Sequence, residues 1–341
     1  MKSRRIALAG TGGVVALASA LAFAPGAIAD PTALAAATCS PVTNIEAIID
    51  DSGSMSFSDA DKLRVSALSL LIDTPGNEKI TLGAVEFGGQ IGFPGEPPAA
   101  DTVFPPEPIG ANATAMKAAL AARIDADNGL TDYNAAFARA QQDNPNAKAR
   151  IFLTDGGHDN GEYTNGHRGG PPTYVIGFGG ATFGENGDRL RTIASETGGR
   201  AFLQTDDRNL QAVMNEIGTT LTCQSPPKAF RDAFTKVNQA RTHGVSVASA
   251  ARTAQLTLSW SSPLDAFTIG KLRIVKRGRV VAVASRKRHL RVTVRRGSTF
   301  LVVKVGNLTR GKLQFSVRAT RIGSGAPSVN LTTQVTQSRR R

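Results

Sequence analysis

The sequence DDSGSM follows directly on the apolar run IEAII, so that a buried segment ends on side chains rich in oxygen. Asp50, Ser52 and Ser54 lie at every second position of this stretch. Thr131 in NGLTDYN and Asp155 in LTDGG, which follows another apolar run, offer the same chemistry. Hard divalent cations such as Mg²⁺ take oxygen ligands in near-octahedral geometry. Two carboxylates and three hydroxyls therefore predict a metal site with a coordination position left open.

A second interpretation of these residues is purely local. Ser, Asp and Thr favour strand ends and turns because their side chains bond to the neighbouring backbone. Each of the five residues alone fits that interpretation. The oxygen chemistry that all of them share favours the cation.

Alternating strand-like and helix-like segments must position these residues. Strands are expected at 43–50, 79–87, 149–155, 173–179 and 200–205. Helices are expected at 58–73, where Ser58 and Asp61 form a start like a capping box, and at 113–124, 131–142, 188–199 and 207–221. This alternation predicts an α/β fold with a doubly wound, mostly parallel sheet, whose ligand sites lie at the carboxyl ends of the strands.

The pattern changes after Cys223. Apolar and polar residues now alternate with period two, as in Leu256, Leu258 and Trp260, which is typical of strands with one buried face. Strands are expected at 254–260, 271–284, 289–294, 299–305 and 312–320. We therefore predict a 224–230 linker, a small antiparallel β-sandwich over 231–325 and a flexible basic tail over 326–341.

Charge divides the chain at the same place. Residues 30–223 carry 13 Lys/Arg against 25 Asp/Glu, a net −12, and residues 224–341 carry 24 against 2, a net +22. One interpretation is that this charge reflects solubility and a general preference for arginine. So basic a domain should still bind polyanions in a salt-dependent way, and outside a cell these are anionic surface polymers or lipid headgroups. Sparse aromatic residues argue against dedicated nucleic-acid binding.

The N-terminus has the order of a secretory signal. Lys2, Arg4 and Arg5 precede an apolar run that ends in Ala27-Ile28-Ala29, so we predict a signal peptide over 1–29 and a secreted or cell-surface protein with no later membrane span. The alternative is a retained membrane anchor. An even count of two cysteines, Cys39 and Cys223, in an exported chain favours a disulfide over two unpaired thiols.

The motif Asp-x-Ser-x-Ser at 50–54, the distant Thr131 and the strand-end Thr-Asp-Gly at 154–156 resemble the von Willebrand factor type A (vWA) domain over residues 39–223. The resemblance implies an intact metal-ion-dependent adhesion site. Ser52, Ser54 and Thr131 would then contact the metal by hydroxyl, and Asp50 and Asp155 largely through water.

The resemblance also has implications beyond the metal. The open position would take an Asp or Glu carboxylate of a protein partner, with Mg²⁺, or else Mn²⁺ or Ca²⁺, as the ion. Cys39 and Cys223 bracket the vWA-like segment, as in some extracellular members of the family. Apart from the resemblance, Asp132 beside Thr131 is expected to cap a helix or to be solvated, and a role in tuning the site is the alternative. The back half resembles the bacterial pre-peptidase C-terminal β-sandwich and supplies no site residues.

Together these observations predict a secreted, metal-dependent adhesion or protein-binding module and not an enzyme. One rival is a structural envelope scaffold whose metal site is vestigial. The other is a metal-dependent hydrolase. No nucleophile-elbow or triad motif accompanies the serines, which disfavours the hydrolase.

Overall fold

The computed structural model describes residues 41–74, 77–89, 98–126, 129–179, 183–205, 210–222, 228–249, 251–283 and 290–339. The predicted signal segment and the predicted disulfide between Cys39 and Cys223 lie outside the described residues. No helix in the described part of the chain has both the length and the apolar character needed to cross a membrane.

The front half is built on a six-stranded sheet of order β3-β2-β1-β4-β5-β6. Its strands are β1 (Asn44–Asp50), β2 (Thr81–Phe87), β3 (Ala100–Pro108), β4 (Ala149–Thr154), β5 (Thr173–Phe178) and β6 (Arg200–Thr205). All neighbouring pairs run parallel except β2 and β3. The predicted mostly parallel sheet is therefore confirmed, although the sequence did not reveal β3.

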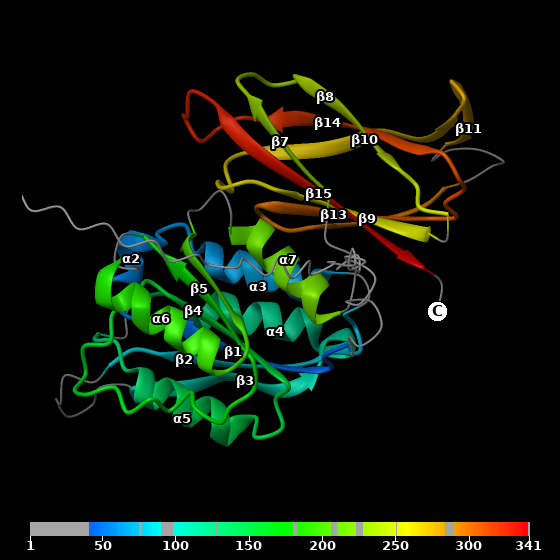
Figure 1. Ribbon diagram of the computed structural model, residues 1–341. Helices are drawn as coiled ribbons and strands as arrows, with labels where there is room; N and C mark the ends of the chain where they lie inside the picture. Colours follow the sequence, from blue (N-terminus) through cyan, green and yellow to red (C-terminus); the bar gives the residue numbers. More distant parts are fainter. Residues whose placement is uncertain are drawn as a thin grey trace, which may run out of the picture. The chain divides into compact units, whose positions relative to one another are not determined.

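Helices cover both faces of this sheet. They are α2 (Met55–Ser58), α3 (Leu63–Asp73), α4 (Ile109–Arg123), α5 (Tyr133–Asp143), α6 (Gly184–Glu196) and α7 (Leu210–Leu221). Side chains of α3, α4 and α7 pack with Ile45, Ala47 and Ile49 of β1, whereas those of α5 and α6 pack with Ile48. Figure 1 shows α5 on one side of the sheet and α3 and α7 on the other. This double cover explains why β1 is apolar on both faces.

The helix expected over 58–73 is shorter than expected, and a separate short helix, α2, precedes it. The predicted start at Ser58 with Asp61 was wrong, because α2 ends at Ser58 and α3 begins at Leu63. The Asp59 carboxylate accepts bonds from the backbone N–H groups of Leu63, at 2.6 Å, and Arg64, at 3.0 Å. Asp59 thus satisfies the free donors at the start of α3.

The back half folds as the predicted antiparallel sandwich (Figure 1). One sheet has the order β11-β10-β14-β8 and the other β12-β13-β9-β15-β7. The strands are β7 (Lys228–Phe234), β8 (Ala240–Ser246), β9 (Ala251–Ser259), β10 (Ala266–Lys276), β11 (Arg279–Val283), β12 (Arg291–Arg296), β13 (Phe300–Gly306), β14 (Lys312–Arg321) and β15 (Val329–Arg339). Trp260, Phe267 and Phe315 are among the large side chains of its core.

Two boundaries of the back half differ from the expected ones. The expected linker over 224–230 ends early, because β7 begins at Lys228. The flexible tail expected over 326–341 was wrong for Val329–Arg339, which form β15 between β7 and β9. The period-two residues Val329, Leu331 and Val335 of this strand are buried in the sandwich core.

The residues from Ser40 onward form one compact unit. Leu70 of α3 shares a small buried cluster with Phe300 and Val302 of β13. The backbone carbonyl of Asp73 also accepts a 3.1 Å bond from Arg295 of β12. The predicted boundary at Cys223 falls outside the described residues.

Glu46 and Arg150 are cross-strand neighbours that lie fully buried within the parallel sheet. Burial raises the pKa of the Glu46 carboxyl to about 8, although a 3.0 Å hydrogen bond from Asn144 opposes the shift. Asp143 adds to the rise and Arg150 opposes it. The folded state therefore holds a proton on Glu46 that the unfolded chain releases at much lower pH.

We expect Glu46→Gln to remove a pH-dependent loss of stability. A raised pKa favours folding below the unfolded value of 4.5, and this contribution is lost as the pH rises toward about 8. The variant should therefore gain in free energy of unfolding, relative to the wild type, between pH 5 and 8. Urea unfolding across this range measures the difference. A constant difference between the two proteins would contradict the prediction.

Candidate metal centre

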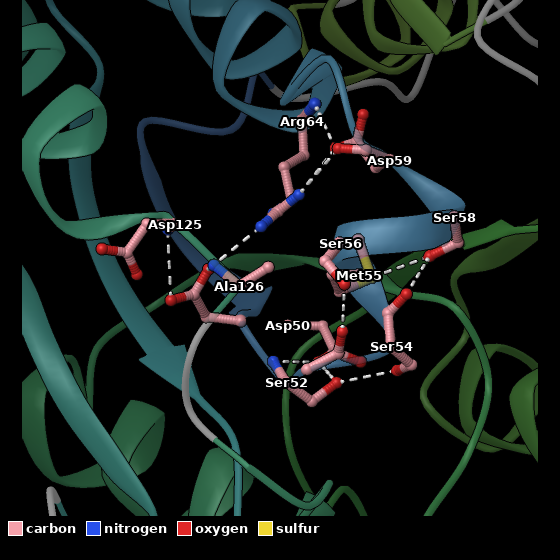
Figure 2. A network of polar contacts seen from close by, with 12 residues as sticks. Asp50, Ser52, Ser54, Met55, Ser56, Ser58, Asp59, Arg64, Asp125 and Ala126 are labelled. Atoms are coloured by element: carbon pink, nitrogen blue, oxygen red, sulfur yellow. Dashed lines mark hydrogen bonds and ion pairs between the residues drawn. The ribbon is translucent and has the colours of Figure 1, made fainter.

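The turn after β1 holds three of the five predicted site residues together. The Asp50 carboxylate accepts bonds from the Ser52 hydroxyl, at 2.6 Å, and from the Ser52 backbone N–H, at 3.0 Å. The Ser52 hydroxyl lies 3.1 Å from that of Ser54. Figure 2 shows the side chains of Ser52 and Ser54 next to Asp50. Asp50 and Ser52 are buried, whereas Ser54 is exposed at the surface.

The end of β4 brings the second carboxylate to this turn. Asp155 accepts a 2.8 Å bond from the Ser58 hydroxyl of α2. Thr154 donates a 2.6 Å bond to the second oxygen of Asp50. Tyr133, fully buried, lies behind Thr154 with its hydroxyl 3.1 Å from the Thr154 hydroxyl. The ends of β1 and β4 and the start of α5 are thereby linked.

Two carboxylates therefore lie close together in a buried place. Desolvation, then the Asp155 carboxylate, raises the pKa of the Asp50 carboxyl to about 7, although the bonds from Ser52 and Thr154 act in the opposite direction. Among the residues that the structure describes, no lysine or arginine contributes to the shift of the Asp50 pKa. The arrangement suits a positive charge at this point.

Thr131 is held beside the turn by backbone contacts. Its N–H donates a 2.6 Å bond to Asp159, and its carbonyl accepts a 3.1 Å bond from the Asp159 N–H. Two residues before it, the Gly129 carbonyl accepts a 3.0 Å bond from Gly53 in the turn after β1. Asp132 accepts a 3.1 Å bond from the Ala135 N–H, so the predicted cap of α5 is confirmed.

Asp51, which from its variable position in the motif is expected to support the site residues or to be solvated, is buried and has a structural role. It forms a 3.0 Å ion pair with Arg64, which also pairs with Asp59 at 2.9 Å, and all three side chains are almost fully buried. Asp51 also accepts a 2.8 Å bond from the Ala126 N–H. Figure 2 shows Arg64 reaching from α3 toward Asp59. Arg64 therefore fixes the turn from behind without entering it.

The chemistry of the donors fits a hard cation. No group of three or more His, Cys, Asp or Glu side chains that could hold a metal occurs within the described ranges. The five predicted residues instead combine two carboxylates with three hydroxyls. Such a set suits Mg²⁺ or Mn²⁺ better than zinc, which takes nitrogen and sulfur ligands.

Comparisons with known proteins give structural similarities alone. No known family matches the chain, and no curated protein matches it. Among solved structures it is similar to a von Willebrand factor type A protein from Catenulispora acidiphila, with 17% identity, a TM-score of 0.43, and coverage of 88% of this chain and 63% of that one. It therefore spans less than two thirds of that protein.

Two further similarities are of the same order. One is to the manganese-loaded TRAP protein of Plasmodium vivax, with 16% identity, a TM-score of 0.39, and coverage of 62% of this chain and 89% of that one. The other is to the pilus adhesin SpaC of Lactobacillus rhamnosus GG, with 12% identity, a TM-score of 0.39, and coverage of 89% and 45%.

Proposed function

We propose that this protein is a secreted binding module that grips a protein partner through a divalent cation. The observation that carries the proposal is the meeting of Asp50, Ser52, Ser54 and Asp155 at the carboxyl ends of β1 and β4. Asp50 and Asp155 lie there as a buried carboxylate pair. A cation would neutralise this pair.

The five residues would have two different roles at the metal. Ser52, Ser54 and Thr131 would hold Mg²⁺, or Mn²⁺ or Ca²⁺, by their hydroxyls, and Asp50 and Asp155 would orient its bound waters. When bound, the cation supplies an electrophile that an Asp or Glu carboxylate of the partner can approach. Asp50, held by Ser52 and Thr154, cannot turn away from this position without losing those bonds.

The surface beside the turn supports docking. Phe57 of α2, three residues after Ser54, is 91% exposed, and an exposed phenylalanine beside such a site suits contact with a partner. We further propose that the basic back half localises the protein on an anionic surface polymer or lipid. Within the described part of the chain, no hydrogen bond joins Ser52 or Ser54 to a histidine.

We expect Ser54→Ala to weaken Mg²⁺ binding by about tenfold or more, by analogy with the loss of groups around metal sites. Ser54 is exposed, and among the described residues its hydroxyl lies within hydrogen-bond distance of one other side chain, that of Ser52. The free energy of unfolding should therefore change by less than about 0.5 kcal/mol. Calorimetric titration of the full chain with Mg²⁺ measures the effect.

Ser56→Ala is the matched control. Ser56 is an exposed hydroxyl of the same segment and donates 2.7 Å to the Gly53 carbonyl. Mg²⁺ binding should be retained in this variant. An affinity that is equal in Ser54→Ala and the wild type would contradict the ligand assignment. No Mg²⁺ binding by the wild type would favour the scaffold with a vestigial site.

A further inference from the structure

The five-stranded sheet of the sandwich carries a hollow of about 520 Å³. Three cationic side chains line it together with two threonines: Arg252, Arg291, Lys304, Thr253 and Thr293. None of the five residues predicted for the metal site takes part. The hollow is large enough to receive a small molecule.

Pairing between strands fixes these side chains on one scaffold. Thr293 of β12 lies opposite Lys304 of β13, and Arg291 lies opposite Gly306. The carbonyl of Arg252, at the start of β9, accepts a 3.1 Å bond from the N–H of Leu308, just after β13. The three cations thus come from three adjacent strands whose register is set by the sheet.

The positive charge of the hollow is not balanced from within the sandwich. Residues 224–341 contain two carboxylates, Asp232 and Asp265. Asp232 pairs with His243 at 2.7 Å, and Asp265 accepts 2.8 and 3.1 Å bonds from the backbone N–H groups of Gly323 and Ser324. Both are therefore occupied elsewhere.

The front half does not balance the hollow either. Across the described ranges, Arg295 with Glu78 is the single ion pair that joins a sandwich cation to a front-half carboxylate. Arg252, Arg291 and Lys304 form no ion pair among the described residues. A ligand that brings negative charge would meet three cations already in place.

We propose that this hollow binds a phosphate group carried on a sugar-sized unit, as in a phosphate-bearing polymer outside the cell. Arginine presents paired N–H donors that match phosphate oxygens, and lysine adds a point charge. The threonine hydroxyls can donate to further oxygens. A sugar fills the space that a lone phosphate would leave. The inference rests on the proposed role of the basic back half and gives that role a defined place.

The test compares two variants of the full chain that remove the same charge. Arg291→Gln/Lys304→Gln removes two cations of the hollow, and Lys276→Gln/Arg279→Gln removes two exposed cations from the β10–β11 hairpin. Calorimetric titration with glucose 6-phosphate should show binding to the wild type, a loss of about tenfold or more in the hollow variant, and less than about a twofold change in the hairpin variant. Thermal unfolding confirms that both variants fold.

The hollow would be overturned as a phosphosugar site by equal losses in the two variants, by glucuronate binding as tightly as glucose 6-phosphate, or by inorganic phosphate doing so. Binding of long-chain polyphosphate, measured at about 50 and 200 mM salt, tests separately the broader proposal that the basic back half binds anionic polymers. Polyphosphate binding without glucose 6-phosphate binding keeps the basic surface and removes the hollow, whereas loss of both removes the surface role too.

Discussion

Asp155→Asn is expected to abolish Mg²⁺ binding and, with it, every divalent-dependent interaction of the protein. The substitution keeps the size of the side chain and its ability to accept the 2.8 Å bond from Ser58. It removes one of the two buried carboxylates that a cation would neutralise. The affinity for Mg²⁺ should fall by about a hundredfold or more, beyond the usual cost of losing a neighbour of a ligand.

Thermal unfolding with Mg²⁺ or EDTA measures this loss without a known partner. The wild type should be stabilised by Mg²⁺, because a ligand of the folded state alone favours that state. Asp155→Asn should unfold at one temperature in both solutions. Asp188→Asn, on the exposed face of α6, is the control and should respond as the wild type does. A retained response in Asp155→Asn would contradict the site.

Arg64→Met is expected to destabilise the protein by about 3–5 kcal/mol. Arg64 is fully buried and pairs with Asp51 at 3.0 Å and Asp59 at 2.9 Å. Its removal leaves two carboxylates buried without their cation. Desolvation already raises the pKa of both carboxyls. Urea unfolding followed by circular dichroism measures the change.

Arg191→Met is the matched control for this result. Arg191 also pairs with an aspartate, Asp188, at 2.8 Å, but both side chains are more than half exposed. Its loss should cost less than about 1 kcal/mol. Adding Asp51→Asn to Arg64→Met should restore part of the stability. A loss below about 1 kcal/mol in Arg64→Met would show that the buried pairs are not needed for the fold.

The sequence predicted those parts of the candidate site that depend on residue type at the end of a strand. Asp50, Ser52, Ser54 and Asp155 follow apolar runs, and parallel strands bring such ends to one edge of the sheet. The burial and the ion pairs of Arg64 could not be predicted from the sequence, because a single arginine within an apolar helix is usually expected at the surface. Its partners become visible only when the start of α3 is placed behind the turn.

Two strands, β3 and β15, were not predicted from the sequence, and each omission has a physical reason. β3 contains Pro105, Pro106 and Pro108, which usually argue against a strand. It tolerates them because it lies at the edge of its sheet, where a missing N–H is harmless. The threonines and glutamines of β15 obscured the alternation of apolar and polar residues that would have predicted a strand. Thr333 and Gln334 are buried, so polarity alone misjudged their surroundings.

The position of β15 controls when the sandwich can be completed. It pairs with β7 on one side and β9 on the other, so these two earlier strands never bond to each other. Residues 228–234 of β7 pair with residues of β15 that lie about a hundred positions later in the chain. Such distant pairings make closure slow and place it after synthesis of residue 329. Until β15 is added, β7 and β9 each have an unpaired edge. A chain that is truncated before β15 should therefore aggregate.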